Sequence, residues 1–305
     1  MIGKYPMTST VPRGRTRSAF VLIGFVALAV LLAACTQSSA PSRYKYNWDI
    51  VVNSIIHPDR LILNGLWLTV SISVVSQLIG VVLGVLGAVG KISRLRPVRW
   101  ISSVYVWFFR GTPLLVQITF IYFGLAVAGI YKWDDIVLLG ITIDGPIQAG
   151  IVALGVNEGA YMTEIVRAGI LAVDTGQMEA AKSLGMTYRQ AMRRIVLPQA
   201  ARVIVPPLGN EFNNMLKTTS LLTVISVAEL YVTFSRKNAS GPTVFHTFEL
   251  MIAAAIWYLL LTSIWGLIQA QIERRLARGT NAAANAGPSM RERIFGASTM
   301  GTGGR

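Results

Sequence analysis

Two apolar runs of this sequence are interrupted by polar residues that could bind a solute: Asn157, Glu158, Lys217, Thr218 and Ser220. The first two lie about ten residues inside the run 147–170, a depth of ~15 Å at the helical rise. The other three interrupt the run 204–232. Ionisable groups at membrane depth are costly and usually face a cavity or one another. Glu158 and Lys217 could therefore bind the two charges of a zwitterionic solute, or they could form an ion pair that locks two helices together.

A third polar stretch, residues 174–198, stands between apolar runs and carries helix-capping signals. Asp174 and Thr187 are each followed three residues later by a glutamine, the spacing of an N-cap residue and its reciprocal partner. Gly185 stands where a left-handed residue would end the first helix, and Pro198 is expected to end the second. These signals predict two short helices joined by a turn, here called the 174–198 loop.

Small side chains are expected to form the surface of this loop: Ala180, Ala181, Ser183 and Gly185. Larger apolar residues are expected to lie behind it: Leu184, Met186, Met192, Ile195 and Val196. Small residues let the backbone of another protein approach closely. The 174–198 loop is therefore predicted to be a docking surface.

The charged residues of the loop have two interpretations each. Glu179 is expected in the first helical turn, where a carboxylate suits the helix dipole, and it either contacts the partner or only supports the cap. Arg189, Arg193 and Arg194 could reach acidic groups of a partner, or they could face solvent and lipid headgroups.

The composition identifies the setting as a membrane. Of 305 residues, 53% are hydrophobic and 14% charged, which excludes an ordinary soluble domain. The net charge of +14 sits between apolar runs, and no basic and aromatic groove points to nucleic acid. The single cysteine excludes a disulfide framework within the chain and a cysteine-based metal site.

A membrane crossing needs about 20 mostly apolar residues. Six runs are candidates, of which the first is short: 19–35, 66–90, 113–130, 147–170, 204–232 and 248–271. Gly111 and Pro113 predict a break that separates a short interfacial helix over 98–110 from the third span. The predicted fold is all-α, a polytopic membrane helix bundle with a five-helix core and one extra N-terminal helix.

Two spacings predict how the spans pack against one another. Gly80, Gly84 and Ala88 recur every four residues, which suits close helix packing in lipid. Glu164 and Arg167 stand three residues apart on one helix, and this spacing predicts a structural ion pair.

The basic residues predict the orientation. With the N-terminus inside, the inner segments 1–18, 91–99, 171–203 and 272–305 hold 19 Lys and Arg, whereas the outer segments 36–65, 131–146 and 233–247 hold 6. Basic residues accumulate on the cytoplasmic side of membrane proteins. Both termini and the 174–198 loop are therefore expected in the cytoplasm.

The chain ends carry weaker signals. The arginines before the run 19–35 and the sequence LAAC ending at Cys35 fit a signal peptide with a lipoprotein-like acylation site, or an uncleaved helix with a buried cysteine. The predicted organisation is an N-terminal basic segment, helix and outer linker over 1–63, a membrane domain over 64–273, and a disordered cytoplasmic tail over 274–305.

Several stretches together resemble one protein family. EAAKSLGM at 179–186, followed by IVLPQA at 195–200, is similar to the EAA loop of type I ABC import permeases. Four further stretches resemble the polar amino acid branch of that family, which serves histidine, glutamine, glutamate and arginine: NGLWLTV at 64–70, RGTPLLVQ at 110–117, GAYMTEIVRAGI at 159–170 and LKTTSLLTVISVAEL at 216–230. The resemblance covers roughly 64–273.

The resemblance implies a permease subunit of an ATP-driven importer for polar amino acids in a bacterial cell membrane. It implies ATPase subunits that bind ATP, an extracytoplasmic solute-binding protein, and a second permease subunit, identical or different. The chain itself would then be no enzyme and would hold no cofactor. The implied ATPase-docking residues are Glu179, Ala180, Ala181, Lys182, Ser183, Leu184, Gly185 and Arg189.

Two other classes of protein remain as alternatives. An ATP-independent secondary transporter or channel would explain the polar residues within the spans, but it leaves the 174–198 loop without a partner. A membrane-embedded enzyme needs a nucleophile, base or metal constellation. The only histidines, His57 and His246, lie on predicted outer loops and form none.

Overall fold

The computed structural model describes residues 45–138, 140–239, 243 and 246–277. The predicted span at 19–35, the motif at Cys35 and the predicted tail from residue 278 on lie outside the described residues. From Asn47 onward, the described residues belong to the second of two compact units, Asn47–Arg305.

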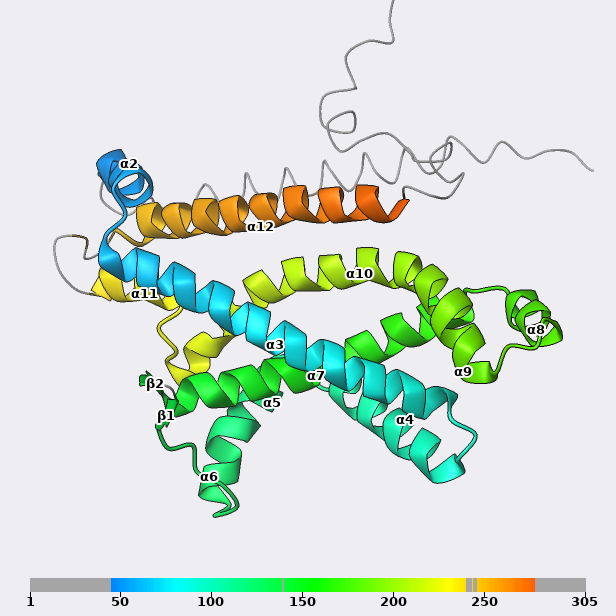
Figure 1. Cartoon of the computed structure of the whole chain (residues 1–305). Helices are drawn as coiled ribbons and strands as arrows, with labels where there is room; N and C mark the ends of the chain where they lie inside the picture. The colour runs from blue at the N-terminus through cyan, green and yellow to red at the C-terminus, as the bar shows by residue number, and fades with distance from the viewer. Residues whose placement is uncertain (1–44, 139, 240–242, 244–245, 278–305) are drawn as a thin grey trace, which may run out of the picture. The chain divides into compact units, whose positions relative to one another are not determined.

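This unit is built almost entirely of helices, which confirms the predicted all-α class (Figure 1). The long helices and their continuations are α3 (Arg60–Ile92), α4 (Arg96–Gly111), α5 (Leu114–Thr119), a π-turn (Phe120–Gly124) with α6 (Leu125–Val127), α7 (Gly145–Leu171), α10 (Leu197–Thr218) and α12 (Thr247–Ala277). The shorter helices are α2 (Trp48–Ile56), α8 (Thr175–Ser183), α9 (Tyr188–Ala191) and α11 (Leu230–Ala239). A small antiparallel hairpin of β1 (Ile136–Leu138) and β2 (Ile141–Ile143), which the sequence analysis did not predict, precedes α7.

Length and hydropathy identify the helices that could cross a membrane. In the described part of the chain, α3 and α12 each pass this test, and there are up to four such crossings if each of two bent helix pairs counts as one. Helix α7 covers the predicted span 147–170 with 27 residues. Its crossing of the membrane stays a prediction, because polar residues such as Asn157 and Glu158 dilute its apolar composition.

Helices α3 and α7 pack closely through the small residues predicted for this role. An added Cβ at Gly84 would lie 2.2 Å from the Cβ of Met162, and one at Gly80 would lie 2.6 Å from the Cγ of Glu158. Ala88 is completely buried. The predicted packing spacing is therefore confirmed, and it brings Glu158 directly against the backbone of α3.

The chain bends by 104° between α4 and α5–α6, at the predicted break. Thr112 is extended because the following Pro113 disfavours helical geometry at the preceding residue. The side-chain amide of Gln117 donates to the carbonyl oxygens of Phe109 and Thr112 at 2.9 and 3.1 Å. These bonds help to satisfy the carbonyl groups at the end of α4, which have no partner within the helix.

The prediction that Pro198 ends the second helix of the 174–198 loop is wrong. The chain stays helical from α9 through a π-turn (Met192–Val196) into α10, and Pro198 stands in the first turn of α10. In the π-turn, the N–H of Leu197 donates to the carbonyl of Met192, five residues back. A proline is tolerated at this place because the wider turn relieves its ring and its missing N–H needs no partner.

The predicted continuous span 204–232 is broken in the structure. Helix α10 passes into a 3₁₀ turn (Thr219–Ile225), and Ser226 then adopts a left-handed conformation with φ of 61°. The buried Glu229 restarts the helix, because its carboxylate accepts the N–H of Val232 at 2.9 Å and the hydroxyl of Tyr258 at 2.7 Å. The sequence analysis missed this buried carboxylate.

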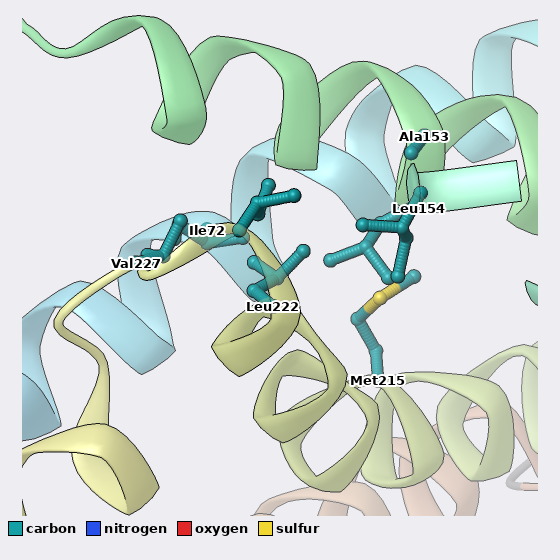
Figure 2. Packing of buried hydrophobic residues seen from close by; sticks show 8 residues of the cluster. Ile72, Ala153, Leu154, Met215, Leu222 and Val227 are labelled. Carbon is teal, nitrogen blue, oxygen red and sulfur yellow. The ribbon is translucent and has the colours of Figure 1, made fainter. Parts of the chain in front are cut away.

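One apolar cluster joins α3, α7, α10 and the 3₁₀ turn, and it also includes Ile118 of α5. Figure 2 shows side chains of this cluster from all four elements and from the segment that follows the 3₁₀ turn: Ile72, Ala153, Leu154, Met215, Leu222 and Val227. In lipid, such contacts stabilise mainly by close packing, since lipid tails are as apolar as the side chains. The cluster therefore fixes the positions of α7 and α10, which carry the polar residues within the predicted spans.

Candidate functional site

The 174–198 loop forms the two predicted short helices, α8 and α9. Thr187 and Gln190 cap α9 reciprocally, with bonds of 3.3 and 2.9 Å between each side chain and the other's backbone N–H, as predicted. Asp174 caps α8, but its carboxylate accepts the N–H of Gly176 at 2.7 Å rather than forming the reciprocal pair with Gln177.

Gly185 ends α8 in the left-handed conformation that the sequence predicts, with φ of 80°. The N–H of Gly185 donates to the carbonyl of Lys182, and the N–H of Met186 donates to the carbonyl of Ala181. These two bonds form a Schellman motif, which turns the chain sharply toward α9. No heavy atom outside its immediate neighbours lies within 4 Å of an added Cβ at Gly185, so this turn presents open backbone to the surroundings.

Ala181 was predicted to lie on the surface of the loop and Leu184 behind it, but the structure shows the reverse. Ala181 is 1% exposed and lies beneath the loop, whereas Leu184 is 81% exposed. The reason is the turn itself: Leu184 is the last residue before Gly185, so its side chain leaves the helix face that packs on the π-turn after α9. The exposed surface therefore includes a large apolar side chain among the small ones.

The other implied docking residues lie on the exposed surface: Glu179, Ala180, Lys182, Ser183, Gly185 and Arg189. Glu179 is the fifth residue of α8, so the expectation that it lies in the first helical turn is wrong. Its carboxylate makes no hydrogen bond to any described residue, and the cap of α8 is made by Asp174. The carboxylate of Glu179 is therefore available to a partner rather than used within the loop.

A cavity of about 330 Å³ lies between α5, α7 and α10. Three of the five residues predicted for a solute pathway line this cavity: Asn157, Glu158 and Thr218. The other lining residues, which the sequence analysis did not select, are Leu114, Leu154, Tyr161, Glu211, Asn214 and Met215. A volume of this size is at the lower end of the range for small-molecule sites. The cavity could therefore hold one small polar solute.

The predicted partnership of Glu158 and Lys217 is not formed. Lys217 is exposed, is absent from the cavity lining, and forms no ion pair with Glu158 or another described residue. Ser220 is also absent from the lining, and its hydroxyl donates to the carbonyl of Lys217 at 2.7 Å. The reason is the rotation of α10, which turns another of its faces toward the cavity.

That face carries Glu211, Asn214 and Thr218, which the helical repeat places above one another at i, i+3 and i+7. The sequence analysis did not select Glu211 and Asn214. The same repeat, counted back from Thr218, would have identified them.

Glu158 is 6% exposed, and one of its carboxylate oxygens, Oε1, has no hydrogen-bond partner among the described residues. Its neighbour Asn157 is occupied, since its amide donates to the carbonyl of Phe109 and to the side chain of Gln117, both at 3.0 Å. Asn157 therefore connects α7 by hydrogen bonds to the bend between α4 and α5. Glu158, in contrast, has an oxygen atom at the cavity that could still accept a hydrogen bond.

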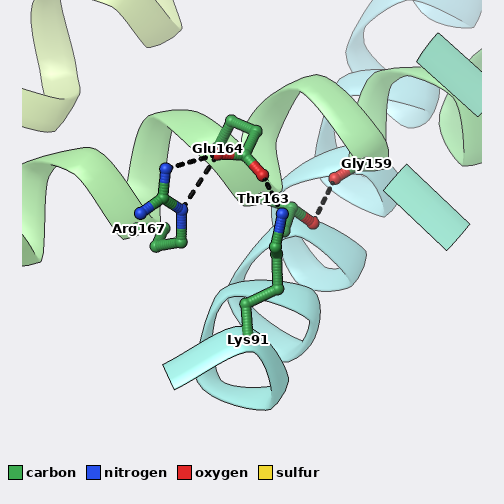
Figure 3. Close-up of polar contacts among 5 residues, drawn as sticks. All are labelled: Lys91, Gly159, Thr163, Glu164 and Arg167. Carbon is green, nitrogen blue, oxygen red and sulfur yellow. Dashed lines mark hydrogen bonds and ion pairs between the residues drawn. The ribbon is translucent and has the colours of Figure 1, made fainter. Parts of the chain in front are cut away.

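Glu164 and Arg167 form the predicted ion pair, with the guanidinium on one carboxylate oxygen at 2.8 and 2.9 Å. Lys91 of α3, which the sequence analysis did not include, donates to the other oxygen (Figure 3). This triad joins the C-terminal ends of α3 and α7. It is a structural device, and it lies apart from the cavity lining.

Asp59 carries an ion pair outside the predicted spans. Its carboxylate caps α3 by accepting the N–H of Ile62 at 3.0 Å, and it pairs with Lys237 of α11. Partial burial acts to raise the pKa of Asp59, but the hydrogen bond from Lys237 and that from Ile62 outweigh it and hold the pKa below its ordinary value. In the part of the chain that the structure describes, no group of His, Cys, Asp and Glu could hold a metal ion.

Comparison with known proteins relates these features to one family. A family model for the binding-protein-dependent transport system inner membrane component matches residues 80–278. The arginine transport system permease protein ArgU of Corynebacterium glutamicum is 38% identical over 259 residues, which are 83% of this chain and 79% of ArgU. The arginine permease ArtQ of Bacillus subtilis is 40% identical over 70% of this chain and 92% of ArtQ, and the L-cystine permease TcyB of the same organism is 38% identical over 76% and 92%. A crystal structure of an amino acid ABC transporter with histidines has a chain that superposes with a TM-score of 0.66 at 36% identity, over 76% of this chain and all of that chain.

Proposed function

The chain belongs to the family of binding-protein-dependent transport system inner membrane components, and we propose that it is the permease subunit of an ATP-driven importer of polar amino acids. The single observation that supports this proposal best is the combination of two sites in one helical unit. An exposed two-helix loop with an open glycine turn stands at one place, and a polar cavity between α5, α7 and α10 at another.

The 174–198 loop would dock an ATPase subunit. Glu179 offers an unpaired carboxylate, Gly185 an open backbone and Leu184 an exposed apolar side chain. A partner could therefore make a charged contact with Glu179, a close backbone contact at Gly185 and an apolar contact with Leu184. ATP would be bound and hydrolysed by that partner, and this chain would hold no cofactor and catalyse no reaction.

The cavity would form part of the solute pathway, supplied by an extracytoplasmic solute-binding protein. A second permease subunit, identical or different, would complete the pathway, with membrane lipids around both. Asn157, Glu158 and Thr218 remain the pathway residues, while the positions of Lys217 and Ser220 place them outside the cavity lining.

The chain is a membrane protein, and the proposed orientation places both termini and the 174–198 loop in the cytoplasm of a bacterial cell. Single cysteines in a Cys35→Ser background test it. Ser183→Cys should react with a membrane-impermeant thiol reagent only in inside-out vesicles, and Lys132→Cys, in the exposed loop before the β-hairpin, only in intact cells. The reverse labelling pattern would contradict the orientation.

Reconstitution tests the proposed function. Proteoliposomes would contain the permease, its ATPase and its binding protein, and uptake would be followed with a panel of labelled amino acids. The proposal predicts uptake of at least one polar amino acid that stops when ATP is withheld. Uptake of equal rate without ATP would instead support a secondary transporter or channel, which is the alternative that the cavity alone allows.

A further inference from the structure

The ionisable side chains that line the cavity between α5, α7 and α10 are all acidic. Two carboxylates line it, Glu158 of α7 and Glu211 of α10, and the residues of its lining include no lysine, arginine or histidine. Both carboxylates line the same cavity, so a charge on one acts on the other. Two like charges at one cavity repel each other, and this repulsion is relieved when a cation lies between or beside them or when one carboxyl group is protonated.

Glu158 also has an unused acceptor at this cavity. It is 6% exposed, and its Oε1 atom has no hydrogen-bond partner among the described residues. A buried carboxylate with an oxygen that lacks a partner costs free energy, so binding of a cation there gains more than binding at an exposed carboxylate. The side chain of Glu158 packs against Gly80 of α3, where an added Cβ would lie 2.6 Å from its Cγ atom.

The nearby cationic side chains do not fill this role. Lys217 is exposed and outside the lining. The guanidinium of Arg110 lies over the ring of Tyr161, 5.1 Å from its centroid, and Arg110 is likewise not a lining residue. The negative charge that faces the cavity is thus left for a ligand.

We infer that this cavity selects amino acids with a cationic side chain, an ammonium or a guanidinium, over neutral and acidic amino acids. This inference rests on the proposed function and narrows its substrate class. The cationic side chain would lie at Glu158 and Glu211, while Asn214 and Thr218 on the same face of α10 offer polar groups to the rest of the solute. An acidic amino acid would add a third negative charge, and a neutral one would leave both carboxylates without a counter-charge.

Equilibrium binding to the purified permease–ATPase complex, without the binding protein, tests the inference. Labelled L-arginine, L-glutamine and L-glutamate serve as probes, so that the preference of the binding protein does not enter. We expect L-arginine to bind at least about tenfold more tightly than L-glutamine, in keeping with one charge-assisted hydrogen bond, and L-glutamate not to bind detectably.

Glu158→Gln and Glu211→Gln should each weaken L-arginine binding about tenfold or more and leave L-glutamine binding within about threefold. Glu273→Gln is the matched control, since this carboxylate of α12 lies outside the cavity lining and should leave both affinities unchanged. The glutamine variants keep the shape of the side chain and remove a charge, so we expect normal amounts of complex, as measured by co-purification of the ATPase.

Equal affinity for L-arginine and L-glutamine, tighter binding of L-glutamate, or unchanged L-arginine binding in both glutamine variants would each overturn the inference and leave the importer function standing. If no ATPase co-purified with the wild-type permease, the proposed function itself would be contradicted. The two failures are therefore distinguishable.

Discussion

Substitution of Gly185 separates the backbone requirement of the 174–198 loop from its contact with a partner. Gly185 has a φ of 80°, and no atom outside its immediate neighbours lies within 4 Å of an added Cβ. Any L-residue with a Cβ in this conformation costs about 1–2 kcal/mol, and asparagine costs less because its side chain bonds locally. Within this chain, the Cβ atom that Gly185→Asn, Gly185→Ala and Gly185→Arg each add has no neighbour to clash with.

At a docked partner the three variants differ strongly. The arginine side chain projects into the surface where we propose that the ATPase backbone approaches, whereas asparagine and alanine add little bulk. If the whole conformational cost of about 1–2 kcal/mol weakens docking, the affinity for the ATPase falls roughly 5- to 30-fold. We therefore expect retained docking for Gly185→Asn, partial docking for Gly185→Ala and none for Gly185→Arg.

The assay is co-purification of the ATPase with tagged permease from membranes that contain equal amounts of each variant. The thermal unfolding midpoint of the purified permease is the control, and it should be alike for the alanine and arginine variants. Equal co-purification with these two variants would refute the reasoning, because a partner would then not approach the turn. Glu179→Lys should abolish uptake in the same way, while the protein stays in the membrane.

Three further predictions concern the helical frame. Gly84→Ala should destabilise the protein by about 1–3 kcal/mol, because its Cβ has no room against α7, and Gly266→Ala in open surroundings should not, as measured by thermal unfolding in detergent. Glu164→Gln should lower the free energy of unfolding by about 1 kcal/mol, because Lys91 and Arg167 both lose their charged partner. This value lies between those for exposed and for buried ion pairs. The lowered pKa of Asp59 means that its stabilising effect is present above the pKa of the unfolded chain and is lost as the pH falls toward the folded-state pKa. In Asp59→Asn, the free energy of unfolding should therefore fall less steeply than in the wild type as the pH drops below about 4. The same pH dependence in both proteins would contradict the role of Lys237.

The local signals of the sequence predicted local geometry well. The reciprocal cap of Thr187, the left-handed turn at Gly185 and the glycine repeat of α3 are all confirmed. Each of these depends on a few residues whose backbone or size permits one arrangement. The break at Pro113 is of the same kind, because proline restricts the residue that precedes it.

Features that depend on helix rotation or on a distant neighbour could not be predicted in the same way. The exposure of Leu184 and the burial of Ala181 depend on how α8 packs on the π-turn after α9. The separation of Lys217 from Glu158 depends on the rotation of α10 around its axis. The continuation of the helix through Pro198 needed the π-turn, and no local signal specifies such a turn.

Site-specific cross-linking tests the central claim, the docking of an ATPase on the 174–198 loop, most directly. Leu184 is 81% exposed on the loop and Val127 is 89% exposed at the end of α6, so neither side chain is covered by the rest of this chain. In membranes that contain the complete transporter, we predict a permease–ATPase adduct from position 184 and none from position 127. An adduct from position 127 with none from position 184 would contradict the account.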